Sequence, residues 1–199
     1  MGEAPRLSDR FTLLVPVDPA GLGLLDPLHL GGLLLRPKIE HHLTVFNYPI
    51  GKLLRKACTA APALRGAIDA AAAAVDWSHA PEGVYVHLEK TLGLHGKEDL
   101  HTIIARVAAP VAPFFASARA LVAAACPPGE VGDLLAALES PPPPHITLYT
   151  NDPDRKEGIG LNRAADLEAA LARAKGGGDG VRATLLGPDV RVRGSRGPY

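Results

Sequence analysis

Pro143-Pro144-His145-Ile146-Thr147-Leu148-Tyr149-Thr150 repeats, in residue types, an earlier run of the chain, His41-His42-Leu43-Thr44-Val45-Phe46-Asn47. Each copy reads histidine, apolar, threonine, apolar, aromatic, polar. Successive side chains of an extended strand alternate between the two faces of a sheet. We therefore expect His145, Thr147 and Tyr149 to share one face of a strand.

The earlier copy predicts the same arrangement for His42, Thr44 and Phe46. His42 and His145 are separated by roughly half of the chain, which indicates two similar lobes that each deliver one histidine–threonine strand to a shared cleft. A single copy is typical of an ordinary half-buried strand, and the repetition is what favours a functional site.

The size and charge of the chain suit one compact unit. With 199 residues, the chain can bury a sizeable core, and we treat residues 1–199 as a single domain made of two lobes, with a monomer as the default state. Lysine and arginine together number 21, as do aspartate and glutamate. Because the net charge is zero, a polyanionic substrate has to be held by local contacts rather than by the whole surface.

Cysteine usage and hydropathy bear on location. Cys58 and Cys126 lack the spacing of a metal site or a disulfide framework, which fits a reducing cytoplasm. The apolar run 11–17 is too short for a signal-peptide core or a membrane span. We therefore expect a cytoplasmic protein without membrane attachment.

Hydrophobic alternation and helix-breaking residues predict the secondary structure. Besides the two motif runs, strands are expected at 11–17, 84–88, 101–107, 181–186 and 190–193. Helices are expected at 51–75 with a break at Pro62, and at 113–125, 131–138 and 166–175. Strands and helices mix without regular alternation, so we expect an α+β fold. The two lobes suggest a bilobal, pseudo-symmetric arrangement of two antiparallel sheets flanking a central cleft, with helices on the outside.

Two facing histidines and their threonine neighbours suit phosphate chemistry. An imidazole with an ordinary pKa near 6.5 serves as a base when neutral and as an acid when protonated, so two of them form an acid–base pair that needs no metal or cofactor. Threonine hydroxyls on the same face supply donors to phosphoryl oxygens. The pattern favours hydrolysis of a cyclic phosphodiester, with His42 and His145 as the acid–base pair and Thr44 and Thr147 holding the phosphate.

His42-Leu43-Thr44-Val45 and His145-Ile146-Thr147-Leu148 resemble the paired His-x-Thr-x motifs of the two-histidine (2H) phosphoesterase superfamily, which includes 2′-5′ RNA ligases and RNA cyclic phosphodiesterases. The resemblance implies a bilobal α+β fold with the two motifs on central strands of opposed sheets. It implies a nucleotide or RNA-end substrate, either a 2′,3′-cyclic phosphate or a cyclic nucleotide. Two alternatives stay open: a non-catalytic nucleotide- or RNA-binding module on the same fold, and 2′-5′ RNA ligation.

Several other residues have two possible roles. Phe46 and Tyr149 could border the base or ribose of a substrate, or they could pack beneath the site. Lys52 could reach a substrate phosphate or remain in solvent. His41 faces away from His42 on an extended strand and is expected to be structural.

The remaining chemistry-bearing residues carry weaker signals. His87, His95 and His101 could form a metal site, but their spacing does not match a helical zinc motif, so none is predicted. Four arginines near the end of the chain are expected at a solvated edge: Arg182, Arg191, Arg193 and Arg196. Gly158-Ile159-Gly160 lacks a third glycine of a dinucleotide fingerprint and is expected in a flexible loop beside the cleft.

Overall fold

The fold is known from a computed structural model that describes residues 4–91, 99–173, 180–187 and 190–192. The described strands are β1 (Leu13–Pro16), β2 (Leu28–Leu30), β3 (Leu33–Pro37), β4 (His42–Phe46), β5 (Ala80–Lys90), β6 (Leu100–Ala108), β7 (His145–Thr150) and β8 (Val181–Leu185). The described helices are η1 (Pro19–Leu22), α1 (Tyr48–Ala60), α2 (Ala63–Ala73), α3 (Val111–Ala125), α4 (Pro128–Ala137) and α5 (Ala164–Ala172). The expected α+β class is confirmed, whereas the strand expected at 190–193 is not formed by residues 190–192.

The described strands join in one antiparallel sheet with the order β1-β4-β7-β6-β5-β8, and the β2–β3 hairpin adds to it where β3 pairs with the end of β7. This differs from the expected pair of opposed sheets. The two motif strands, β4 and β7, are direct neighbours because Leu43 pairs with Ile146 across the join between the two halves. The histidines therefore approach one another side by side on one sheet.

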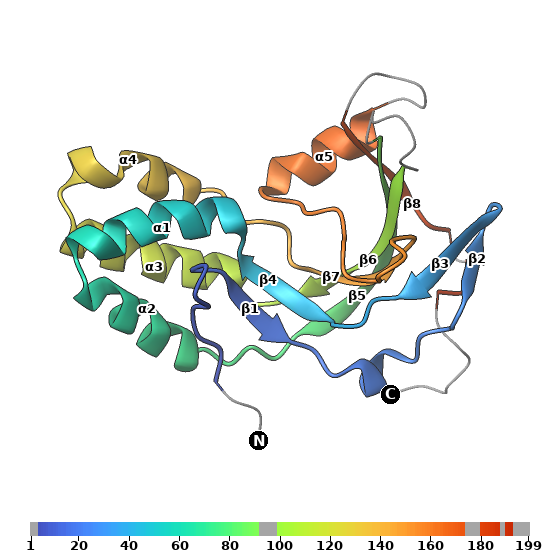
Figure 1. The fold of residues 1–199 in the computed structure, drawn as a ribbon, viewed down its shortest axis with the longest axis horizontal. Coiled ribbons are helices and arrows are strands. Elements are labelled where there is room, and N and C mark those ends of the chain that lie inside the picture. Colours follow the sequence, from blue (N-terminus) through green and yellow to red (C-terminus); the bar gives the residue numbers. More distant parts are fainter. Residues whose placement is uncertain (1–3, 92–98, 174–179, 188–189, 193–199) are drawn as a thin grey trace.

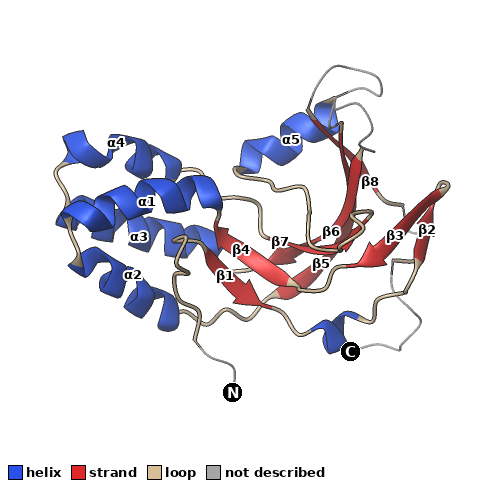
Figure 2. Cartoon of the chain, viewed as in Figure 1, coloured by secondary structure: helices blue, strands red, loops and turns tan. Residues whose placement is uncertain are grey.

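The helices are unevenly distributed around this sheet (Figures 1 and 2). α1 to α4 gather at one end, and α5 lies apart from them near β8. A large core contains apolar side chains of α1 to α4 and residues such as Leu43 and Ile146 of the motif strands. A smaller core on the opposite face joins α5 to β5 and β6 through Leu167, Val86 and Ile104.

The sequence explains where the helix after the first motif begins and how it ends. The Asn47 side chain caps α1 by accepting a hydrogen bond from the backbone N–H of Ile50 at 3.0 Å, and Pro49 stands in the first turn, where its missing N–H leaves no donor unused. Pro62 separates α1 from α2, as expected. The first motif strand is thereby followed at once by a helix.

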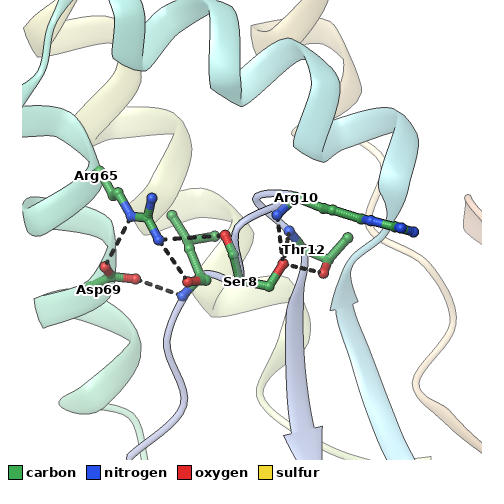
Figure 3. A network of polar contacts seen from close by, with 6 residues as sticks. Ser8, Arg10, Thr12, Arg65 and Asp69 are labelled. Atoms are coloured by element: carbon green, nitrogen blue, oxygen red, sulfur yellow. Dashed lines mark hydrogen bonds and ion pairs between the residues drawn. The ribbon is translucent and has the colours of Figure 1, made fainter.

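The segment before β1 is tied to the helical layer (Figure 3). Asp69 on α2 accepts a hydrogen bond from the backbone N–H of Leu7 at 2.7 Å, and Arg65 donates to the Leu7 carbonyl at 3.1 Å. The Ser8 hydroxyl oxygen lies 2.7 Å from that of Thr12 and accepts from the Thr12 backbone N–H. These contacts fix the entry into β1, which pairs with the first motif strand.

Both motif strands carry the same irregularity immediately after their threonine. Along the β1–β4 ladder, Leu13 pairs with Phe46 and Leu14 with Thr44, so Val45 is an extra residue. Along the β6–β7 ladder, the partners of Ile103 and Ile104 are Tyr149 and Thr147, so Leu148 is extra in the same way. Each strand therefore contains a β-bulge at the fourth position of its motif, and a bulge shifts the side chains beyond it to the other face.

Of the two roles expected for Phe46 and Tyr149, the bulges favour packing beneath the site and speak against their predicted contact with a substrate. Phe46 is 1% exposed and packs against the rings of Phe114 and Phe115 at 5.4 and 5.3 Å between centroids. Tyr149 is 0% exposed, and its hydroxyl donates to the Val192 carbonyl at 2.7 Å while accepting from the Leu25 N–H at 2.8 Å. Both aromatic side chains belong to the large core.

Tyr149→Phe should lower the free energy of unfolding by about 1–3 kcal/mol, because it leaves a buried carbonyl and a half-buried N–H without their partner. Urea denaturation checks this, with Tyr48→Phe on an exposed ring as the control. A Tyr149→Phe protein of unchanged stability but altered ligand affinity would return this residue to the candidate site.

Candidate active site

The antiparallel pairing of β4 with β7 brings four predicted residues together. Leu43 lies opposite Ile146, and continuing this register by one residue on each side sets His42 beside Thr147 and Thr44 beside His145. Directly opposite side chains have Cβ atoms about 5 Å apart, and diagonal ones about 7–8 Å apart. The two imidazoles thus occupy one diagonal of a small rectangle and the two hydroxyls the other. We call these four residues the quartet.

The quartet points away from the large core. Leu43 and Ile146 belong to that core, so their neighbours along each strand face the opposite side of the sheet. Ile104, the β6 partner of Thr147, belongs to the smaller core beneath α5. The quartet therefore lies beside the smaller core, on the sheet face that α1 to α4 leave uncovered.

His145 is held in one tautomer. Its Nδ1 lies 2.7 Å from the Pro143 carbonyl oxygen, to which it donates, so Nε2 is left as the basic nitrogen. The run of prolines 141–144 holds this chain extended and supplies carbonyls without competing N–H groups. Burial lowers the pKa of His145, against the opposing effect of the Pro143 hydrogen bond, and the ring is only 6% exposed.

His42 is more accessible and is surrounded by charge. Burial lowers its pKa, the nearby Lys38 ammonium lowers it further, and Glu40 opposes both. A charge on His145 also lowers the pKa of His42, so protonation of one imidazole disfavours protonation of the other. This coupling suits a pair in which one ring holds a proton and the other accepts one.

Lys38 is a site residue that the sequence prediction missed. It is 9% exposed, and its ammonium donates to the Lys156 carbonyl. Burial lowers the pKa of Lys38, while the carboxylates of Asp152 and two glutamates favour its charged form. Its position four residues before His42 gave no signal, since an extended strand would place it roughly 13 Å away.

A kink between β3 and β4 explains how Lys38 reaches the quartet. Pro37 pairs with Tyr149, and Leu43 pairs with Ile146. The chain from Pro37 to Leu43 therefore contains more residues than the stretch of β7 between their two partners. The surplus residues fold out of the sheet around His41, which is buried with Nε2 3.4 Å from the Leu148 carbonyl oxygen. The structural role expected for His41 agrees with this placement.

The loop of residues 151–163, which we call the β7–α5 loop, lies beside the quartet. A methyl group built on Gly158 would lie 3.3 Å from Thr147 Cγ2 and 3.6 Å from Lys38 Nζ. Ile159 is buried in the smaller core, and Asn162 accepts a hydrogen bond from the Asn47 side chain at 2.9 Å. The predicted loop beside the site is present, and glycine at 158 permits its close approach to Thr147.

A cavity of about 200 Å³ opens beside His42. Its lining residues are Lys38, Ile39, Glu40, His42, Arg155 and Lys156. Three of these six side chains are basic and one is acidic, which makes the cavity suitable for an anion.

Other predicted residues lie elsewhere or in other roles. Lys52 is exposed, with its ammonium 4.7 Å from the centre of the Tyr48 ring, and no contact joins it to the quartet among the described residues. Arg182 forms an ion pair with Glu89, so it is engaged at the sheet edge. Arg191 is exposed, as predicted, and Arg193 and Arg196 are outside the described residues.

The weaker metal alternative gains no support. His87 Nε2 and His101 Nδ1 lie 3.1 Å apart with stacked rings, while His95 falls outside the described residues. Among the described side chains, no group of three or more His, Cys, Asp or Glu residues is arranged to hold a metal ion. Cys58 and Cys126 are buried free thiols. No helix within the described ranges has the length and apolar character needed to cross a membrane.

Comparisons of the chain with protein-family models, curated proteins and solved structures return no match.

Acidification should destabilise the fold through its buried histidines. The pKa of His145 is lowered in the folded state, so the unfolded chain takes up the proton first. The neutral His145 ring thus contributes to the free energy of unfolding at pH values above the ordinary histidine pKa of about 6.5. This contribution is lost as the pH falls from that value toward the lower pKa of His145 in the folded protein. Urea denaturation at about pH 7.5 and about pH 5.5 measures the loss.

His145→Gln should make this pH dependence shallower, because glutamine does not titrate, and His29→Gln at an exposed position is the matched control. An unchanged slope in His145→Gln would contradict the buried neutral state assigned to this ring.

Proposed function

We propose that this chain is a two-histidine phosphoesterase that hydrolyses a cyclic phosphodiester, either the 2′,3′-cyclic phosphate of an RNA end or a cyclic nucleotide. The observation that carries the proposal is the pairing of Leu43 with Ile146, from which strand register places the two imidazoles and two threonine hydroxyls of the quartet on alternate corners of one antiparallel strand pair. With opposite Cβ atoms about 5 Å apart and diagonal ones about 7–8 Å apart, the quartet is close to the size needed to surround one phosphoryl group.

The pairing around Leu43 and Ile146 supports the finer idea of two pseudo-equivalent lobes. An antiparallel pair has a local two-fold axis, and here that axis relates β4 to β7 and β1 to β6. Val45 and Leu148, the two bulge residues, correspond under the same operation. We propose that this repetition makes the site pseudo-symmetric, with each lobe supplying one histidine and one threonine.

The chemistry follows from this arrangement. A neutral imidazole takes a proton from water, and the water oxygen attacks phosphorus. The bond from phosphorus to one ribose oxygen breaks, and the protonated second imidazole gives its proton to that leaving oxygen. Thr44 and Thr147 donate hydrogen bonds to the phosphoryl oxygens, and Lys38 beside Thr147 stabilises the charge that develops there.

The lowered histidine pKa values are compatible with this role. Burial disfavours a cation in the free site, but a bound phosphodiester brings a negative charge between the two rings. An anion at that distance raises the pKa of both imidazoles and favours the singly protonated pair. The substrate itself therefore promotes the protonation state that the reaction needs.

His42→Ala and His145→Ala should each lower kcat for a nucleoside 2′,3′-cyclic phosphate by about 10²–10⁴-fold, because each removes one proton-transfer group. The reaction is followed by separating cyclic and opened phosphates chromatographically. His29→Ala, at an exposed strand position, is the matched control and should keep wild-type turnover.

Addition of a chelator should leave the wild-type rate unchanged, because both proton transfers use imidazoles. Wild-type turnover in either His42→Ala or His145→Ala would disprove the acid–base assignment. Tight binding of cyclic phosphates and their products without any hydrolysis would instead indicate a binding module, and joining of RNA ends would indicate ligation.

A further inference from the structure

The cavity beside His42 has features that hydrolysis of a single phosphodiester does not use. In the proposed reaction the quartet holds one phosphoryl group, and Arg155 and Lys156 line the cavity without belonging to the quartet. A volume of about 200 Å³ is below the range of about 300–1,000 Å³ of pockets that enclose a drug-sized molecule. The space therefore suits a small charged group better than a nucleobase with its sugar.

The basic groups of the cavity are held in place by backbone contacts. Arg155 Nε donates to the Pro37 carbonyl at 2.7 Å, which occupies one of the five donors of its guanidinium. The Lys38 ammonium donates to the Lys156 carbonyl, which occupies one of its three donors. Both side chains are thus oriented before a ligand binds, which lowers the entropy lost on binding.

The turn that carries Arg155 and Lys156 is rigidly built. The Asp152 carboxylate accepts hydrogen bonds from the backbone N–H groups of Lys156 and Glu157, both at 2.8 Å. Arg155 has a φ of 59°, an uncommon left-handed conformation for a residue with a side chain, and its carbonyl accepts from the Ile39 N–H at 3.2 Å. Strained backbone of this kind persists where the surrounding structure fixes it, often at ligand sites.

The lining of the cavity has an excess of basic residues. Lys38, Arg155 and Lys156 face Glu40 as the one acidic lining residue. The carboxylates of Asp152 and Glu157 also act on the Lys38 charge but lie outside this lining, and that of Asp152 accepts hydrogen bonds from the backbone of its own turn. Because His42 lines the same cavity, an anion bound there is close enough to the quartet to be part of the same molecule.

We propose that the cavity beside His42 binds a second phosphate of the substrate, so that the preferred substrate is a cyclic phosphodiester carrying another phosphate group. This inference rests on the proposed function in taking His42 as part of the reacting site. The second phosphate has the same chemistry whether it is the 5′-phosphate of a mononucleotide or the neighbouring phosphodiester of an RNA strand.

Binding of product-like ligands tests this without requiring turnover. Calorimetry on the full chain compares adenosine 2′-monophosphate with adenosine 2′,5′-bisphosphate, and with a dinucleotide that ends in a 2′-phosphate. The bisphosphate, the dinucleotide or both should bind about tenfold more tightly than the monophosphate or better, since charge-assisted contacts to phosphate are among the stronger hydrogen bonds. A gain confined to the bisphosphate identifies a terminal phosphate, and a gain for the dinucleotide identifies an RNA strand.

Arg155→Gln and Lys156→Gln should each reduce this preference severalfold, and raising the salt concentration should reduce it further. Lys156→Gln keeps the backbone carbonyl to which Lys38 donates, so we expect this variant to preserve the turn. It therefore tests the proposal even if the Arg155→Gln protein does not fold. Arg119→Gln and Lys56→Gln, on exposed helix positions, are matched controls and should keep the wild-type preference.

Equal affinities for the three ligands, or a preference unchanged in both cavity variants, would overturn the second-phosphate site even if the chain hydrolyses cyclic phosphodiesters. Conversely, a clear preference in a protein that hydrolyses no cyclic phosphodiester would uphold the second-phosphate site and overturn the proposed reaction alone.

Discussion

The backbone pairing of Leu43 with Ile146 sets the geometry on which the candidate site depends. It joins the two halves of the chain into one sheet and places each histidine beside the threonine of the other half. Strand spacing and residue rise are nearly constant in proteins, so once this register is set the separations of the four side chains follow. The large core of α1 to α4 protects that register from slippage, because a shift of one residue would turn Leu43 and Ile146 into solvent and the histidines into the core.

The electrostatics of the site complement this geometry. Burial and the Lys38 charge lower the pKa of His42, and burial lowers the pKa of His145, so both rings favour the neutral form more than they would in water. An anionic ligand would offset both effects. The kinked connection before β4 and the β7–α5 loop contribute the basic residues, so the charge of the site comes from segments outside the motif strands. A chain with no net charge can in this way concentrate positive charge where a phosphate would bind.

Much of this arrangement could be predicted from the sequence, and the failures have physical causes. Alternation along His42-Leu43-Thr44 and His145-Ile146-Thr147 correctly separates the polar face from the core face, because both segments are regular up to their threonine. Alternation fails for Phe46 and Tyr149 because a bulge follows each threonine, and nothing in the residue types marks a bulge. Lys38 and Arg155 were missed because long-range register and a turn held by Asp152 bring them to His42, and local patterns contain neither. The expectation of opposed sheets was wrong because the pairing partner of a strand is set by the whole fold.

A crystal structure of the protein soaked with inorganic phosphate or vanadate would show whether the quartet binds one phosphoryl group. We expect one tetrahedral or bipyramidal anion between β4 and β7, with its oxygens about 2.7–3.2 Å from Nε2 of both His42 and His145 and from the hydroxyls of Thr44 and Thr147. Imidazoles that point to separate surfaces, or an anion that contacts only one of the two strands, would contradict it.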